Sequence, residues 1–131
     1  MTRIFAPLIF AVLLAPLAEA DDRVFEMRTY TTNPGKLDAL HKRFSTHTNH
    51  LFVKHGMTLI GYWTPNEGPE AQNTLVYILA YPSKEAREAS WNAFMGDPVW
   101  KAAYAESIKD GKLVSNVESK FLNPTHYSPI R

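Results

Sequence analysis

Three polar residues that could bind or activate a ligand alternate along one short segment of the chain. Glu26, Arg28 and Tyr30 are two residues apart, and Phe25 and Met27 alternate with them. Side chains at two-residue spacing share one face of a β-strand. A guanidinium beside a phenol can hold an anionic or carbonyl-bearing ligand, so Arg28 is a candidate catalytic residue. The alternative is an ion pair that sets the register between subunits. Both interpretations place this face in a sheet-to-sheet interface.

The five histidines are the other candidates for acid–base or metal chemistry: His41, His47, His50, His55 and His126. The first four fall in one predicted helix. His47 and His50 are close enough in sequence for one metal ion to bridge them, but no nearby carboxylate completes a ligand set, so no metal site is predicted. His47 adjoins the apolar side of the helix and is a candidate acid, base or axial haem ligand. Apart from haem, no cofactor is expected.

Aromatic side chains are concentrated in the middle of the chain. The predicted central strands carry Tyr62, Trp63, Tyr77 and Tyr81, and the helices add Trp91, Trp100 and Tyr104. Apolar rings with few polar groups suit a flat organic ligand held between helices and sheet, with Asn73 and Tyr77 to orient it. The alternative is that the rings fill the core. The candidate ligand-binding residues are Tyr30, Tyr62, Trp63, Asn73, Tyr77 and Trp100.

Composition and motifs exclude several classes of function. The sequence contains no cysteine, which rules out thiol catalysis, zinc–thiolate sites and iron–sulfur clusters. The formal net charge is +1 and the basic residues are scattered, so nucleic acid is not an expected partner. No nucleophile elbow, phosphate-binding loop or glycine-rich dinucleotide turn is present.

The N-terminus has the pattern of a secretory signal peptide, which we assign to residues 1–20. A short basic head precedes an apolar run over residues 4–17, and Ala18-Glu19-Ala20 supplies the small residues that signal peptidase requires. The run is shorter than the ~20 residues of a membrane-spanning helix; a membrane anchor or a buried first helix is the alternative. We therefore expect an exported protein, periplasmic or secreted, with no membrane span after cleavage. One domain at residues 21–122 would precede an extended tail at residues 123–131.

Periodicity and turn residues predict the elements of this domain. Asn33 would cap the first helix, with Pro34 as its first residue, and Gly56 would end it. Ser83 and Asp97 would cap the two later helices. The predicted strands are residues 23–30, 57–64, 73–81 and 113–122, and the predicted helices are residues 34–55, 84–95 and 98–108.

The order of these elements is that of a ferredoxin-like α+β fold. Strand, helix, strand, strand, helix, helix and strand (βαββααβ) give an antiparallel sheet with the helices on one face. The face without helices would expose apolar side chains, for which we consider Leu59, Tyr62, Val76 and Ile78. Packing two such sheets face to face would bury them, which predicts a homodimer.

Several segments resemble the NIPSNAP family when taken in order. They are Glu26-Met27-Arg28-Thr29-Tyr30, Pro34-Gly35-Lys36, Gly61-Tyr62-Trp63-Thr64, residues 74–81, Glu85-Ala86-Arg87 and Asp97-Pro98-Val99-Trp100. The resemblance covers about residues 23–122. It implies a dimeric α+β barrel, related in fold to small cofactor-free monooxygenases and haem-degrading enzymes. It implies no particular reaction, because the family has none that is generally established.

Three hypotheses for the function follow. The first is an exported, homodimeric domain that binds a small apolar or aromatic molecule. The second is a cofactor-independent oxygenase or isomerase that uses Arg28 and His47 with a tyrosine. The third is a scaffold whose partner is another protein.

Overall fold

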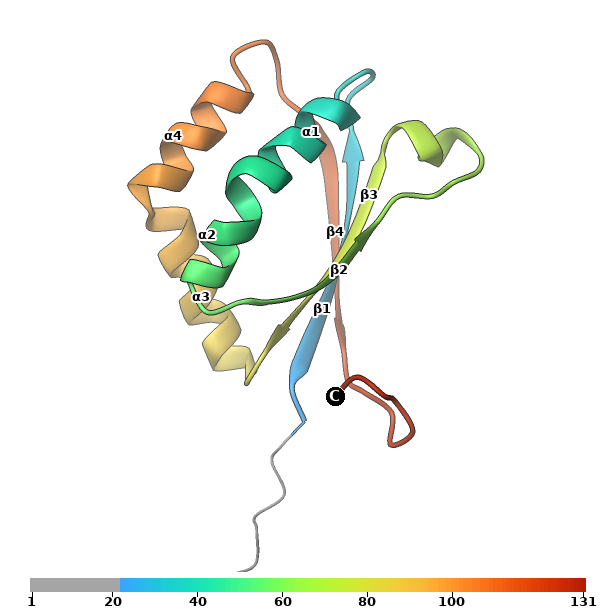
Figure 1. Ribbon diagram of the computed structural model, residues 1–131, viewed down its shortest axis with the longest axis vertical. Helices are drawn as coiled ribbons and strands as arrows, with labels where there is room; N and C mark the ends of the chain where they lie inside the picture. Colours follow the sequence, from blue (N-terminus) through green and yellow to red (C-terminus); the bar gives the residue numbers. More distant parts are fainter. Residues whose placement is uncertain (1–21) are drawn as a thin grey trace, which may run out of the picture.

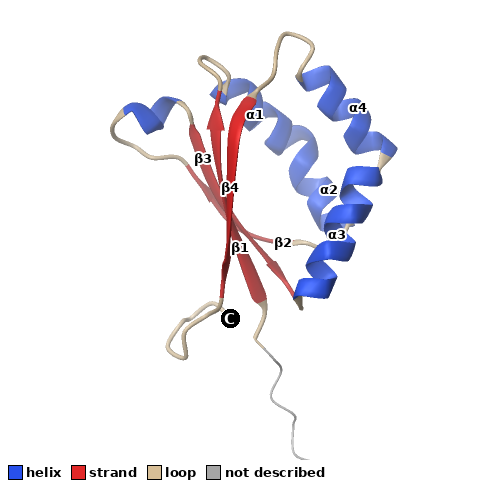
Figure 2. Ribbon diagram, turned by 180° about the vertical axis from the view of Figure 1, so that it is seen from behind, coloured by secondary structure: helices blue, strands red, loops and turns tan. Residues whose placement is uncertain are grey.

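The computed structural model describes residues 22–131, so the predicted signal peptide lies outside the described residues. Helices cover one face of a four-stranded sheet (Figures 1 and 2). None of the helices in this part of the chain is both long and apolar enough to span a membrane. The strands are β1 (Val24–Thr32), β2 (Thr58–Trp63), β3 (Thr74–Tyr81) and β4 (Val114–Leu122), and the helices are α1 (Leu37–Arg43), α2 (Asn49–Lys54), α3 (Lys84–Gly96) and α4 (Pro98–Ser107).

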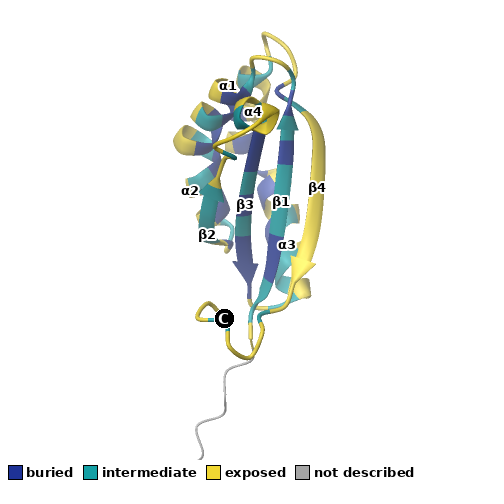
Figure 3. Cartoon of the chain, turned by 90° about the vertical axis from the view of Figure 1, so that its right-hand side faces the viewer, coloured by how far each residue is buried: buried dark blue, intermediate teal, exposed yellow. Residues whose placement is uncertain are grey.

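The strands lie in the order β2-β3-β1-β4, and every neighbouring pair is antiparallel. This confirms the predicted ferredoxin-like α+β arrangement. The apolar β3 lies in the centre of the sheet beside β1, as its composition predicts. Figure 3 shows β3 and β1 largely buried or half-buried, whereas β4 is an exposed edge strand.

The predicted helix ends are confirmed at three of the four positions. The Ser83 hydroxyl accepts a hydrogen bond from the Ala86 amide at 3.0 Å, and the Asp97 carboxylate accepts one from the Val99 amide at 2.9 Å. Gly56 has a φ of 85° and follows the last residues of α2, where a left-handed residue closes the helix. These local signals fix where α2 ends and where α3 and α4 begin.

The predicted start of the first helix is wrong. α1 begins at Leu37 after Lys36, rather than at Pro34, and Asn33 is not its cap. The Asn33 side chain instead donates a hydrogen bond to the Lys112 carbonyl at 2.8 Å. Its own carbonyl accepts from the Lys36 amide in a turn. A hydrogen bond to the segment before β4 therefore occupies the Asn33 side chain, which the sequence predicted as the cap of the first helix.

Glu26, Arg28 and Tyr30 share one face of β1 as predicted, but it is the face that the helices cover. The predicted location at a sheet-to-sheet interface is therefore wrong. Their hydrogen-bond partners lie on the helix-facing side of β3 and β4 and on α3. Glu26 is fully buried there. Burial of a carboxylate is tolerated because its partners are arginines and hydroxyls, which cannot be identified from the alternation of β1 alone.

In the described part of the chain, no helix covers the other face of the sheet (Figure 1). This face carries apolar side chains. Val76 and Ile78 belong to it, whereas Leu59 and Tyr62 pack into the core on the helix side, contrary to the prediction. The C-terminal segment covers one end of this face, because it turns back at Thr125 rather than staying extended. The fold is thus built of two layers, with one side of the sheet partly uncovered.

Candidate functional site

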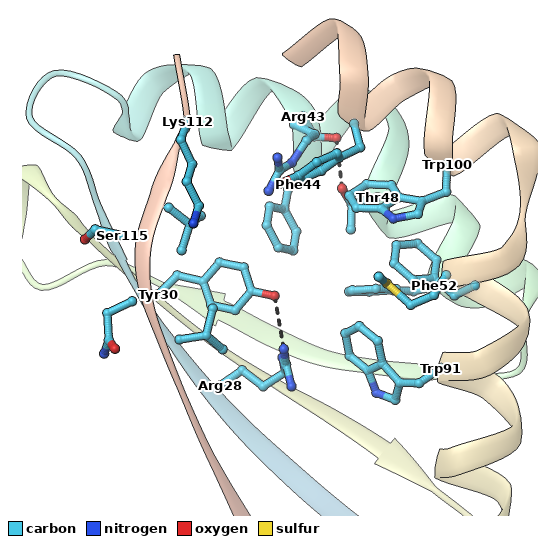
Figure 4. A pocket seen from close by; sticks show the side chains of 16 residues that line it. Arg28, Tyr30, Arg43, Phe44, Thr48, Phe52, Trp91, Trp100, Lys112 and Ser115 are labelled. Atoms are coloured by element: carbon cyan, nitrogen blue, oxygen red, sulfur yellow. Dashed lines mark hydrogen bonds between the residues drawn. The ribbon is translucent and has the colours of Figure 1, made fainter. Parts of the chain in front are cut away.

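A cavity of about 430 Å³ lies between the sheet and the helices (Figure 4). β1 and β4 form one wall, and α1, α2, α3, α4 and the segment between α1 and α2 form the other. Rings from Phe52, Trp91 and Trp100 line the helix side, and Tyr30 projects from the sheet. The remaining lining residues are Arg28, Arg43, Phe44, Thr48, Phe94, Met95, Tyr104, Lys112, Val114, Ser115, Asn116 and Val117.

A π-helical segment, Phe44–Thr48, joins α1 to α2 and shapes this wall. The extra residue in its turn shifts the side chains that follow it, a feature often found at functional sites. The Thr48 hydroxyl donates to the Arg43 carbonyl at 3.3 Å, which supports the widened turn. Phe44 meets Tyr30 and Tyr77 edge-on, at ring-centre distances of 5.9 and 5.2 Å. The sequence predicts one regular helix here and gives no sign of the π turn.

A cluster of ion pairs and hydrogen bonds lies at one end of the cavity, with the Glu26 carboxylate at its centre. Arg87 donates to the carboxylate at 3.1 and 2.8 Å, and Arg28 donates at 3.0 Å. Ser119 and Tyr81 donate at 2.6 and 2.8 Å. Burial by itself raises the pKa of Glu26, but these hydrogen bonds and the charge of Arg28 outweigh that effect and lower it to about 2. Glu26 therefore stays ionised, and both of its carboxylate oxygens accept two or more hydrogen bonds.

Arg28 connects this cluster to the cavity. Its guanidinium lies over the Trp91 ring at 4.4 Å and donates to the Tyr77 hydroxyl at 2.9 Å. A longer contact of 3.4 Å reaches the Tyr30 hydroxyl. Burial lowers the pKa of Arg28, but the neighbouring phenols and Glu26 raise it by more, so the side chain stays charged.

The Tyr30 hydroxyl has a proton that no described residue accepts. Tyr77 is fully buried and its oxygen accepts from Arg28, so its own proton goes to Tyr30, 2.8 Å away. Tyr30 then accepts from both neighbours. Because a phenol has one proton, that of Tyr30 is left to point into the cavity. Figure 4 shows this hydroxyl directed toward the cavity centre.

Arg43 is a second buried cation on the cavity wall, and within residues 22–131 it has no carboxylate partner. It is 6% exposed, and its Nη1 donates to the Ser107 hydroxyl at 3.2 Å. Its Nε has no hydrogen-bond partner in that part of the chain. The guanidinium lies 5.5 Å from the Trp100 ring centre and 5.2 Å from that of Tyr104. Burial lowers its pKa.

The structure brings some of the predicted site residues together and separates others. Arg28, Tyr30 and Trp100 line the cavity. Tyr77 lies behind Tyr30 in the core, and Tyr62 stacks on Tyr77 at 5.3 Å. The remaining three lie elsewhere: Trp63 is 53% exposed at the end of β2, Asn73 lies in the loop before β3, and His47 lines a separate groove beside α4.

Arg43 and Arg87 are two arginines of the site that sequence reasoning missed. Arg43 follows Leu40 by three residues and precedes Phe44, so helical spacing alone places it beside the apolar stripe. This spacing could have identified Arg43 from the sequence. Arg87 carries no such signal, because its partner Glu26 is far away in the sequence. In the described residues, no three His, Asp or Glu side chains come together as a metal site would require.

Comparisons with known proteins agree on the fold. Residues 25–129 match the family model described as NIPSNAP. A crystal structure of a NIPSNAP family protein of unknown function from Agrobacterium tumefaciens is 28% identical, with a TM-score of 0.73 over 84% of this chain and 95% of that one. A NIPSNAP-like domain protein from Burkholderia xenovorans is 23% identical, with a TM-score of 0.71 over 82% and 90%.

A more distant solved structure shares the fold alone. SnoaB, a cofactor-independent oxygenase from Streptomyces nogalater, is 15% identical, with a TM-score of 0.54 over 83% of this chain and 99% of that one. No curated protein matches the sequence at a significant level.

Proposed function

The chain belongs to the NIPSNAP family, and from the geometry of its own cavity we propose that it binds a small apolar or aromatic molecule between the helices and the sheet. The observation that carries this proposal is a cavity of about 430 Å³ lined by several aromatic rings, with the Tyr30 hydroxyl directed into it (Figure 4). Rings supply contact area, and a few fixed polar groups orient the ligand. No resident cofactor is part of the proposal.

The cavity can be blocked to test this function. Val117 lies on its β4 wall, and Val117→Trp would fill it; Val53→Trp adds the same indole to the exposed side of α2. Calorimetric titration with 2-naphthamide and 2-anthracenecarboxamide should show binding to the wild type and to the Val53 variant, and at least tenfold weaker binding to the Val117 variant, because the indole occupies the ligand's volume. Absence of binding to the wild type, with a protein recovered in pull-downs, would favour the scaffold hypothesis.

We also propose that the working form is an exported homodimer. The pattern of residues 1–20 supports export, and the uncovered sheet face supports the dimer. That face carries Val76 and Ile78, and the half-exposed Trp63 lies over Gly61 at its edge. Apolar surface of this kind is typical of an interface.

Light scattering tests the dimer. Ile78→Asp would place a charge in the interface, so we expect a monomer at concentrations where the wild type is dimeric. Val53→Asp on the exposed side of α2 is the matched control and should remain dimeric. A dimeric Ile78 variant would place the interface elsewhere. Tyr62→Asp does not test the interface, because Tyr62 lies in the core.

A second candidate function is acid–base catalysis on the bound molecule. The favouring observation is the Arg28–Tyr77–Tyr30 chain, which leaves the Tyr30 proton facing the cavity. The fold is shared with SnoaB, which is a cofactor-independent oxygenase. If the protein is an enzyme, Tyr30→Phe should lower turnover by about 100-fold, the usual size of a general acid–base contribution. His47→Ala should leave turnover unchanged, because His47 lies outside the cavity.

A further inference from the structure

We propose that the ligand is a carboxylate attached to a planar ring system, with the carboxylate paired to Arg43. This inference rests on the proposed function and names the class of molecule that the cavity takes. Arg43 lies on the wall opposite Arg28 in Figure 4, on the helix side of the cavity.

The first argument is the state of Arg43 itself. A guanidinium has five N–H donors, and this one makes a single hydrogen bond to a described residue, the Ser107 hydroxyl. Its Nε is buried without a hydrogen-bond partner in residues 22–131. Two rings, Trp100 and Tyr104, hold the group in place without neutralising it. A buried charge without a counter-ion is costly, so an arginine kept in this state fits an anion that arrives with the ligand.

The second argument is the balance of charge around the cavity. In the part of the chain that the structure describes, the lining residues include Arg28, Arg43 and Lys112 but no aspartate or glutamate. The nearby Glu26 is fully used by Arg28 and Arg87, so it cannot neutralise Arg43. The cavity is therefore positively charged inside an apolar wall, where the attraction for an anion is stronger than in water.

The third argument is the shape of the charged group and its surroundings. A guanidinium presents paired N–H donors that match the two oxygens of a carboxylate. Next to it, Phe52, Phe94 and Trp100 form a row of packed rings tilted against one another, with ring centres 4.8 and 4.5 Å apart. A flat ring bearing a carboxylate would pack on these aromatic rings while its carboxylate pairs with Arg43. Lys112 extends along the wall from the segment before β4 and adds positive charge near β4 (Figure 4).

The experiment compares acids with their amides, which have nearly the same shape but no charge. 2-Naphthoate and 2-naphthamide, and the corresponding pair from anthracene, are titrated calorimetrically into the wild type at neutral pH. The acid should bind at least about tenfold tighter than its amide. Arg43→Met should abolish that preference while amide binding persists. Lys101→Met removes one positive charge from the exposed side of α4 and should keep the preference.

Each outcome separates the two proposals. Equal binding of acid and amide to the wild type overturns this inference and leaves the ligand-binding function standing. Binding of neither pair overturns both. A preference that survives in Arg43→Met assigns the anion to another residue and overturns the role of Arg43. If that variant does not fold, Arg43→Lys keeps a charge without the planar fork, and the preference should fall below that of the wild type.

Discussion

Glu26 and Arg43 are both buried charges in the space between the sheet and the helices, yet their surroundings differ completely. Glu26 accepts five hydrogen bonds, and two arginines neutralise it. Arg43 donates one hydrogen bond to a described residue and faces two aromatic rings. The Glu26 cluster is complete without a ligand, whereas the Arg43 end of the cavity is not. A buried charge with all its partners is tolerated in the fold, and removal of a partner is strongly destabilising. A buried charge without partners costs stability and is available for binding.

The largest effect should come from removing the charge at the centre of the complete cluster. Glu26→Gln leaves Arg28 without a counter-ion and Arg87 with only the exposed Glu88, so the free energy of unfolding should fall by about 3–5 kcal/mol. Urea denaturation measures this. Glu88→Gln is the matched control, because Glu88 also pairs with Arg87 but is 64% exposed; it should change stability by less than about 0.5 kcal/mol. A loss below about 1 kcal/mol for Glu26→Gln would mean that the cluster contributes little.

Lowering the pH should remove the same stabilisation gradually, because it protonates Glu26. The pKa of Glu26 is about 2 in the folded protein, below its ordinary value of 4.5. Its contribution is therefore complete above pH 4.5 and is lost as the pH falls from there toward 2, a total of about 3 kcal/mol. Urea denaturation at pH values between 6 and 3 gives the free energy of unfolding of the wild type and of Glu26→Gln. Plotted against pH, the two free energies should converge as the pH falls. Parallel curves would contradict the lowered pKa.

The same substitution at two arginines tests the comparison directly. Arg87→Met removes two hydrogen bonds from Glu26 and should cost about 2 kcal/mol of unfolding free energy. Arg43→Met removes a charge that has no carboxylate partner among the described residues and keeps an apolar side chain against Trp100. Stability should therefore change by less than about 1 kcal/mol in either direction. Equal losses in the two variants would show that Arg43 is as fully compensated as Arg87.

The smallest effect should appear at single hydroxyl groups. The Tyr62 hydroxyl is buried without a hydrogen-bond partner in residues 22–131, so Tyr62→Phe should leave stability unchanged or raise it by up to about 1 kcal/mol. The Tyr81 hydroxyl donates to Glu26 and accepts from Trp91. Tyr81→Phe should therefore cost about 1–2 kcal/mol. Thermal denaturation of the two variants measures the difference, and a reversed order would show that Tyr62 has a partner in solution.

The sequence by itself determined the elements and their order, because the signals for them are local. Alternation in β1, the apolar run of β3 and the capping residues Ser83 and Asp97 act over a few positions, and the structure confirms them. The ferredoxin-like order then follows from the succession of strands and helices. The family resemblance, based on segments in the same order, is likewise confirmed.

Only the tertiary structure decided which side of the sheet holds the chemistry. The period of a strand shows that Glu26, Arg28 and Tyr30 share a face, but both faces have the same period. The choice depends on partners that are distant in the sequence, such as Arg87 and Ser119. Helical spacing places Arg43 beside the apolar stripe of its helix. Its lack of a carboxylate partner within residues 22–131 is a property of the packed cavity, which no single position in the sequence shows.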